Sequence, residues 1–137
     1  MLTVGQALEI EYRVREADLA SALSNDPLDD FPAVFATSRM VALMELAAAR
    51  LMKGELKPGE LSVGVGVEVK HHAATLNGEI VRAKATFLGM DGKFFRFAVE
   101  LFDPAGLAGS GQHTRAIVRT ERLLEGAKQR TAPPASK

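Results

Sequence analysis

The chain has 137 residues, of which 47% are hydrophobic and 25% are charged, a balance typical of one globular domain. Its 17 basic residues equal its 17 acidic residues, so the net charge gives no reason to expect nucleic acid as a partner. The absence of cysteine excludes disulfides and thiolate nucleophiles and fits a reducing compartment. No apolar stretch reaches the length of a membrane span, and the N-terminus lacks the apolar run of a signal peptide. We therefore expect a cytoplasmic protein without a membrane partner.

The N-terminal quarter of the sequence predicts one strand and a long loop region. Residues 2–15 mix apolar and polar side chains, and the apolar ones at 8, 10, 12 and 14 alternate in the pattern of a half-buried strand. Residues 16–35 include a possible short helix at 17–23. Asn-Asp-Pro and Asp-Asp-Phe-Pro segments follow it and are typical of turns.

One long helix is predicted over residues 37–53. Thr37 or Ser38 is the candidate N-cap, and Gly54 follows as a stop signal. Apolar side chains occupy most of the circumference of this helix. A helix of that kind is normally buried on most sides.

Four strands are predicted in the second half of the chain. Valines at alternate positions indicate a strand over 61–69, with the odd positions facing the core. Two further alternating runs, 81–87 and 94–102, are joined by Asp91-Gly92, a dipeptide that favours a hairpin turn. The last strand is predicted over about 107–120. The order of elements predicts an α+β domain in which an antiparallel sheet curls round one helix.

The domain is predicted to span residues 1–124, with no internal repeat and no second core. Residues 125–137 contain Lys128, Arg130 and two prolines, and they are predicted to form a flexible C-terminal tail.

Glu45 is the carboxylate in an unexpected place. At 100° per residue it lies about 110° from the mean direction of the charged side chains Arg39, Arg50 and Lys53. It therefore falls among alanines and methionines. A carboxylate in such surroundings needs a hydrogen-bond or charge partner, and that partner can be catalytic or only architectural.

His71 is the second candidate for chemistry. It ends the valine strand, and continuation of the alternation turns it toward the core, whereas His72 points to the other face. A lone inward histidine is often structural. Together with Glu45, however, it supplies the histidine and carboxylate that proton transfer near neutral pH requires.

A metal site and a phosphate-binding loop are both disfavoured. His71, His72 and His113 lack zinc-ligand spacing, since adjacent strand histidines point to opposite faces. Gly64 and Gly66 lie inside a strand without the spacing of a phosphate-binding loop, and they indicate a bulge or a close approach of the backbone. We predict no metal and no cofactor.

Five segments carry a resemblance to a known family: 31–37 (FPAVFAT), 40–45 (MVALME), 62–64 (SVG), 71–75 (HHAAT) and 109–116 (GSGQHTRA). In order and spacing they resemble the fluoroacetyl-CoA thioesterase family of hot-dog-fold proteins. The likeness covers nearly the whole chain, to about Leu124.

The resemblance implies a fold, an assembly and a set of site residues. The fold is a hot-dog fold, in which a curved antiparallel sheet of about five strands wraps one long central helix. The assembly is a homodimer with active sites at the subunit interface. The implied catalytic group is Thr37, Glu45 and His71. Three further residues are implied to assist or to bind substrate, namely Gly64 through its backbone N–H, Arg115 through its side chain, and Phe31 as an aromatic group over the acyl chain.

The predicted activity is hydrolysis of a short-chain acyl-CoA thioester, such as fluoroacetyl-CoA or a related small acyl-CoA, to the free acid and CoA. Glu45 would act as the nucleophile or as the base that activates water, and His71 would shuttle the proton. Two alternatives belong to other classes. One is a hot-dog acyl-CoA hydratase or dehydratase, and the other is a non-catalytic module that binds acyl-CoA or a small ligand.

Overall fold

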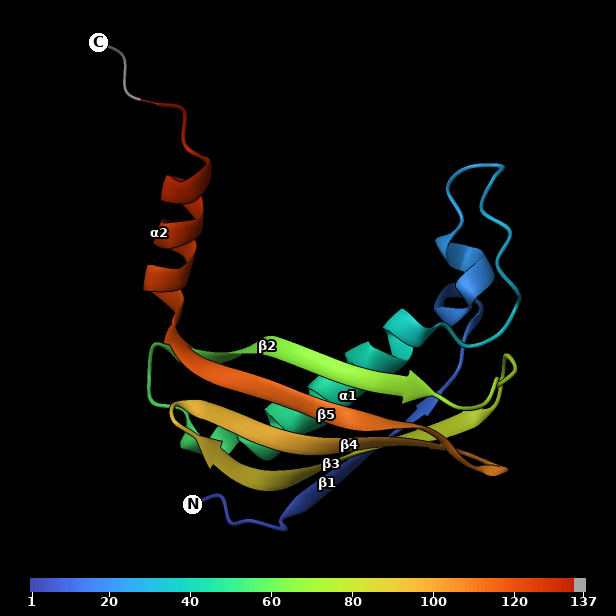
Figure 1. The fold of residues 1–137 in the computed structure, drawn as a ribbon, viewed down its shortest axis with the longest axis horizontal. Helices are drawn as coiled ribbons and strands as arrows, with labels where there is room; N and C mark the ends of the chain where they lie inside the picture. The colour runs from blue at the N-terminus through green and yellow to red at the C-terminus, as the bar shows by residue number, and fades with distance from the viewer. Residues whose placement is uncertain (135–137) are drawn as a thin grey trace.

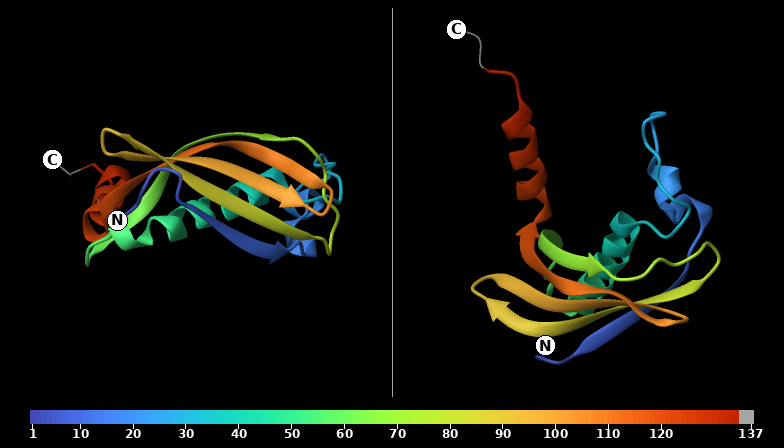
Figure 2. Two further views of the ribbon diagram at one scale, coloured as in Figure 1. Left: turned by 90° about the horizontal axis from the view of Figure 1, so that it is seen from below. Right: turned by 45° about the vertical axis from the view of Figure 1, so that its right-hand side comes forward.

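A five-stranded antiparallel sheet curls around one long helix in the computed structural model, which describes residues 1–134 (Figure 1, Figure 2). The elements in chain order are β1 (Ala7–Arg13), the 3₁₀ helices η1 (Glu16–Asp18) and η2 (Ala20–Leu23), α1 (Thr37–Leu51), the 3₁₀ helix η3 (Lys53–Glu55), β2 (Glu60–His71), β3 (Ile80–Asp91), β4 (Phe94–Asp103), β5 (Gly106–Arg119) and α2 (Thr120–Thr131). The strand order is β1-β3-β4-β5-β2. The predicted α+β fold, with one long helix inside a sheet of five strands, is confirmed.

Helix α1 packs against the concave face of the sheet. Its buried side chains recur at helical spacing, at Met40, Met44, Ala47 and Ala48. The facing positions of β3 and β4 alternate between buried and partly exposed residues, so each strand presents one apolar face to the helix. The helix is therefore buried on its sheet-facing side only, and the prediction that it is buried on most sides is wrong within one chain, where Leu46 is 45% exposed.

The start of α1 differs from the prediction. Ala36, rather than Thr37 or Ser38, is the N-cap residue, and no side chain caps the helix. Thr37 is the first helical residue, and its hydroxyl bonds to a different element, as described below. The helix ends at Leu51, two residues before the predicted end, and a 3₁₀ turn around Gly54 follows it.

Strand β2 contains a β-bulge. Its register with β5 shifts between Gly64 and Gly66, so that Val65 has no partner across the strands. Gly66 and Gly64 were the two strand positions where a bulge was expected, and that expectation is confirmed. A bulge reverses the alternation of side chains along a strand.

The bulge changes which valines face the helix. Val69 and His71 pair with glycines on the helix-facing side of β5, as predicted. Leu61 and Val63, which precede the bulge, pair with residues on the outer side of the sheet. The prediction that all the odd positions share the core face is therefore wrong for these two residues.

The β3–β4 hairpin forms where the Asp-Gly signal predicted it. Strand β3 ends at Asp91 and β4 begins at Phe94. Gly92 adopts a φ of 59°, a left-handed conformation that glycine tolerates without steric cost. The signal was reliable because the turn geometry itself demands that residue type.

Residues 14–36 form a strap that crosses the N-terminal end of α1, and a buried aspartate anchors it. The fully buried Asp18 accepts hydrogen bonds from Tyr12 Oη at 2.6 Å, Arg15 N at 2.8 Å and Arg39 Nε at 3.0 Å. Burial alone would raise the pKa of Asp18, but these hydrogen bonds and the Arg39 charge hold that pKa below its usual value. Arg39 belongs to α1, so this ion pair ties the strap to the helix.

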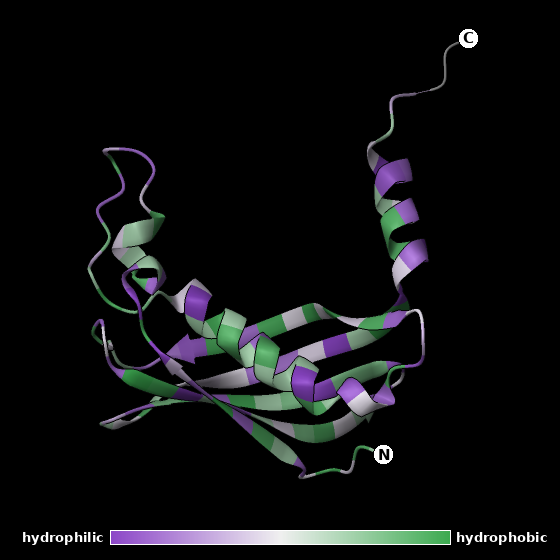
Figure 3. Ribbon diagram, turned by 180° about the vertical axis from the view of Figure 1, so that it is seen from behind, coloured by the Kyte–Doolittle hydropathy of each residue, from purple (hydrophilic) through white to green (hydrophobic). Residues whose placement is uncertain are grey.

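The C-terminal segment differs from the prediction over part of its length. Residues 120–131 form helix α2, which stands away from the sheet and buries no side chain (Figure 1, Figure 3). Strong helix formers fill the segment, with Glu121 in the first turn and Lys128 and Arg130 in the last, where they complement the helix dipole. The sequence analysis did not predict this helix, and the flexibility of the segment that starts at residue 125 stays a prediction. The last three residues of the predicted tail, 135–137, lie outside the described residues.

Within residues 1–134, no helix has the length and apolar content needed to cross a membrane.

Candidate active site

Thr37 and His71 form the first part of the site. The N-terminal end of α1 lies beside the C-terminal end of β2, and this brings Thr37 Oγ1 within 2.9 Å of His71 Nδ1. The other ring nitrogen of His71, Nε2, is buried and has no hydrogen-bond partner. A buried polar atom without a partner is costly and uncommon, so this nitrogen needs a hydrogen-bond partner that residues 1–134 of one chain do not supply. Burial, followed by the nearby His72, lowers the pKa of His71 and keeps its ring neutral.

A hollow of about 390 Å³ lies next to this pair. It is lined by parts of the strap, the first turn of α1 and the segment that follows β2, including Val34, Phe35, Thr37 and His71. The ring of Phe35 packs edge-on against His71, with 6.4 Å between the ring centroids. The hollow therefore combines an apolar wall with two histidines, His71 and His72, and the Thr37 hydroxyl, which suits a small acyl group near a proton carrier.

Glu45 and Arg115 form the second part of the site. Arg115 Nη1 donates to Glu45 Oε1 at 3.3 Å, and His113 Nε2 lies 3.9 Å from the same oxygen. The Glu45 side chain is 43% exposed, whereas that of Arg115 is 9% exposed. The carboxylate is thus anchored from the protein side and open on the other side. That arrangement differs from the deep burial that the apolar surroundings of Glu45 in the sequence suggested.

The lack of a side chain at Gly64 leaves space for the Glu45 carboxylate. The β2 bulge brings the Gly64 backbone so close to α1 that a Cβ atom at this position would collide with Glu45 Oε1. Glycine leaves the Glu45 carboxylate in this position through close approach alone, since the backbone φ of Gly64 is not in the left-handed region. The structure therefore brings together three of the predicted residues, Glu45, Gly64 and Arg115.

The two parts of the site lie apart within one chain. Thr37 and Glu45 are eight residues apart on α1, which corresponds to about 12 Å along the helix axis. No hydrogen bond or ion pair joins Glu45 to either Thr37 or His71 among the described residues. The predicted group of Thr37, Glu45 and His71 is thus present as two separate clusters.

The structure also places three residues differently from the sequence-based expectation, namely Phe31, Ser62 and His113. Phe31 is 48% exposed in the strap and does not line the hollow beside His71, where Phe35 stands instead. Ser62 and His113 were not assigned to the site from the sequence, yet both contact Arg115. The shared strand face of His113 and Arg115 was the available signal for His113. Ser62 joins that face only because of the bulge.

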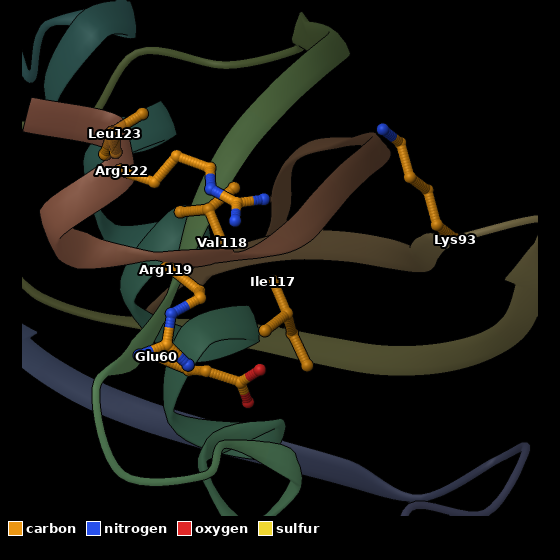
Figure 4. A pocket seen from close by; sticks show the side chains of 7 residues that line it. All are labelled: Glu60, Lys93, Ile117, Val118, Arg119, Arg122 and Leu123. Carbon is orange, nitrogen blue, oxygen red and sulfur yellow. The ribbon is translucent and has the colours of Figure 1, made fainter. Parts of the chain in front are cut away.

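A different hollow, of about 430 Å³, lies at the base of α2 (Figure 4). Arg119, Arg122 and Lys93 are its cationic residues, and Ile117, Val118 and Leu123 supply apolar surface. Figure 4 shows that Arg119 lies beside Glu60, while Lys93 comes from the opposite side. This hollow contains none of the predicted catalytic residues.

Comparisons with known proteins show the family to which the chain belongs. The model of a family described as fluoroacetyl-CoA-specific thioesterase matches residues 14–121. The chain belongs to this thioesterase family. Its curated relative, the fluoroacetyl-CoA thioesterase of Streptantibioticus cattleyicolor, is 39% identical over 102 residues, which cover 74% of this chain and 73% of the relative.

Solved structures support the same family and fold. A fluoroacetyl-CoA thioesterase structure superimposes on this chain with a TM-score of 0.88 at 34% identity. The match covers 98% of this chain and 99% of the chain in that structure. A thioesterase superfamily member from Thermus thermophilus has a TM-score of 0.84 at 28% identity, with 95% and 96% coverage. A hot-dog-like protein from Thermanaerovibrio acidaminovorans, 22% identical with a TM-score of 0.83 and 97% and 96% coverage, shows the fold alone. The predicted hot-dog fold and the prediction of a thioesterase are confirmed.

Proposed function

We propose that this thioesterase hydrolyses a short-chain acyl-CoA to the free acid and CoA, with Glu45 and His71 as its catalytic residues. The observation that carries the proposal is the Glu45 carboxylate, held by Arg115 against the Gly64 backbone and open to solvent on its other side. Such a carboxylate is oriented by a fixed cation and accessible to a substrate, as a nucleophile or general base must be. The curated relative acts on fluoroacetyl-CoA, which makes that compound the first substrate to test.

We further propose that two copies of the chain complete each site. Thr37 and His71 of one subunit would face Glu45 of the partner subunit, because the two clusters are too far apart on α1 to act together within one chain. A two-fold axis that brings the first turn of one α1 beside the middle of the other would create two equivalent sites.

Strand β2 supplies the surface that such a dimer needs. It is the last strand in the sheet order, and among residues 1–134 no strand pairs with its outer side. Leu46, Val65 and Val67, on and beside this strand, are 45%, 49% and 49% exposed. A long apolar edge strand of this kind usually pairs with another chain or is covered. A second copy of the chain meets that requirement and supplies the missing half-site.

The chemistry follows from the charges and donors present. The Glu45 carboxylate attacks the thioester carbonyl or removes a proton from an attacking water, and the carbonyl oxygen becomes an oxyanion near the Gly64 N–H. The carbon–sulfur bond then breaks as the oxyanion collapses. The departing thiolate needs little protonation, because a thiol has a pKa of about 8.5. Along the water route, the proton that Glu45 takes from water passes to the neutral His71, which is steadied by Thr37, and from there to the thiolate. If Glu45 attacks directly, a water molecule hydrolyses the resulting anhydride.

Release of the CoA thiol tests this proposal. We expect the wild-type enzyme to release thiol from acetyl-, fluoroacetyl- and other short acyl-CoAs, and Glu45→Gln and His71→Ala to lower kcat by on the order of 10² or more. Glu11→Gln, an exposed carboxylate change on β1, serves as the control. Wild-type rates in both site variants would refute the assignment. A change in enoyl absorbance without thiol release would indicate a hydratase, and binding without turnover would indicate a binding module. Incorporation of labelled oxygen into the enzyme would distinguish attack by Glu45 from attack by water.

A further inference from the structure

His113 is a buried histidine to which the mechanism above gives no role. It lies on β5, two residues before Arg115, and is 2% exposed. Its ring faces the charged groups Glu45 of α1 and Arg115 of β5, and the backbone of β2. A polar side chain with so little access to solvent must find its hydrogen bonds inside the protein.

The two ring nitrogens of His113 have opposite roles. Nδ1 lies 2.7 Å from the carbonyl oxygen of Gly66, which can only accept, so Nδ1 carries the proton. Nε2 lies 3.1 Å from Arg115 Nη1, which can only donate, so Nε2 is an unprotonated acceptor. Both contacts are satisfied only by the neutral ring, and burial favours that form because it lowers the pKa of His113.

Arg115 is held on three sides before it reaches Glu45. Its Nε donates to Ser62 Oγ and its Nη2 to the Ser62 carbonyl oxygen, each at 3.0 Å. Its Nη1 is shared between His113 Nε2 and Glu45 Oε1. The lone pair on His113 Nε2 therefore orients Arg115 Nη1, the nitrogen that Ser62 does not bind. The orientation of Nη1 in turn sets the position of the Glu45 carboxylate.

The other end of the His113 ring holds the β2 bulge. The acceptor Gly66 is the residue at which the register resumes after the bulge, and Gly64 on its other side touches Glu45. One imidazole thus connects the carboxylate, through Arg115, with the backbone that limits its movement.

We propose that neutral His113 is a positioning residue for thioester hydrolysis, which aims Arg115 at Glu45 and fixes the Gly64–Gly66 bulge beside that carboxylate. His113 has this role only if Glu45 carries the chemistry proposed above. Glu45→Gln is therefore measured in parallel. Full activity in that variant refutes the proposed function, whereas a loss there together with normal activity in the His113 variants refutes the role of His113 alone.

The test uses three substitutions that separate the two hydrogen bonds. His113→Phe keeps the ring volume and removes both bonds. His113→Asn places an amide N–H near the Nδ1 position and retains the bond to Gly66, whereas His113→Gln places an amide oxygen near Nε2 and retains the acceptor for Arg115. Gln112→Ala, on the exposed opposite face of β5, is the control. Thermal unfolding of each variant shows whether it is folded at the assay temperature.

We expect His113→Phe to lower kcat by on the order of 10² and to leave KM within about threefold, because a displacement near 1 Å affects the transition state more than ground-state binding. We expect His113→Asn and His113→Gln each to recover at least about fivefold of that loss. A folded His113→Phe with kcat within about twofold of wild type would overturn the inference. Amide variants no more active than His113→Phe would also overturn it, because a role confined to packing predicts no rescue.

Discussion

Substitution of Gly64 by alanine tests the close contact on which the site depends. The added methyl group would collide with Glu45 Oε1 and would lie 3.1 Å from His113 Cε1 and 3.5 Å from Arg115 Nη1. We expect the Glu45 carboxylate to move away from the added methyl group, because it is the end of a flexible side chain that is 43% exposed. A shift of about 1 Å or more in a reacting group costs on the order of 10² in kcat, or about 2.7 kcal/mol of transition-state stabilisation.

The same substitution is expected to change stability little. Weakening a partly exposed ion pair costs about 0–1 kcal/mol, and replacing a strand glycine by alanine recovers about 0.5–1 kcal/mol. The assay is kcat for CoA release, measured beside the denaturant midpoint. Gly126→Ala is the control, since a Cβ atom there meets nothing within 4 Å. A Gly64→Ala enzyme with wild-type kcat would show that the Glu45 position does not govern the reaction.

The remaining predictions concern pH and the strap. Since the lowered pKa of His71 keeps its ring neutral, kcat/KM is expected to persist below pH 6.5 and to fall only as the pH passes through that lowered value. An acid limb centred at or above 6.5 would contradict this. The free energy of unfolding is expected to decrease as the pH falls below about 6.5, because the unfolded chain binds protons there that half-buried His71 and buried His113 do not bind in the folded protein. Asp18→Asn is expected to cost about 1–3 kcal/mol in urea unfolding, against no change for exposed Asp30→Asn. Since the pKa of Asp18 is lowered, its contribution should be present above about pH 4 and lost on further acidification.

The elements that local chemistry determines could be predicted from the sequence. The Asp91-Gly92 turn and the apolar helix from Thr37 follow from residue conformational preference and from periodicity. Helix α2 was missed because its charged residues and the prolines beyond it suggested a tail, although its composition favours a helix.

The position of the β2 bulge required the structure. Alternating valines continue through Val65 without a break, so the sequence pattern alone placed Leu61 and Val63 on the wrong face. Two contacts join residues that the sequence analysis had singled out, Thr37 with His71 and Glu45 with Arg115, while their roles in catalysis stay a prediction. The distance between these two pairs was not predictable. Sequence periodicity shows which residues share a face, but it does not show which residues of a second subunit would lie beside them.

Complementation between two inactive variants tests most directly that each site is shared by two subunits. Glu45→Gln and His71→Ala chains carrying different affinity tags are expressed together, and the mixed dimer is purified through both tags. One of its two sites then combines an intact His71 with an intact Glu45, so we expect about half of the wild-type kcat per dimer from two parents that are each inactive. A mixed dimer as inactive as its parents, or a protein that forms no dimer, would contradict this account of the site.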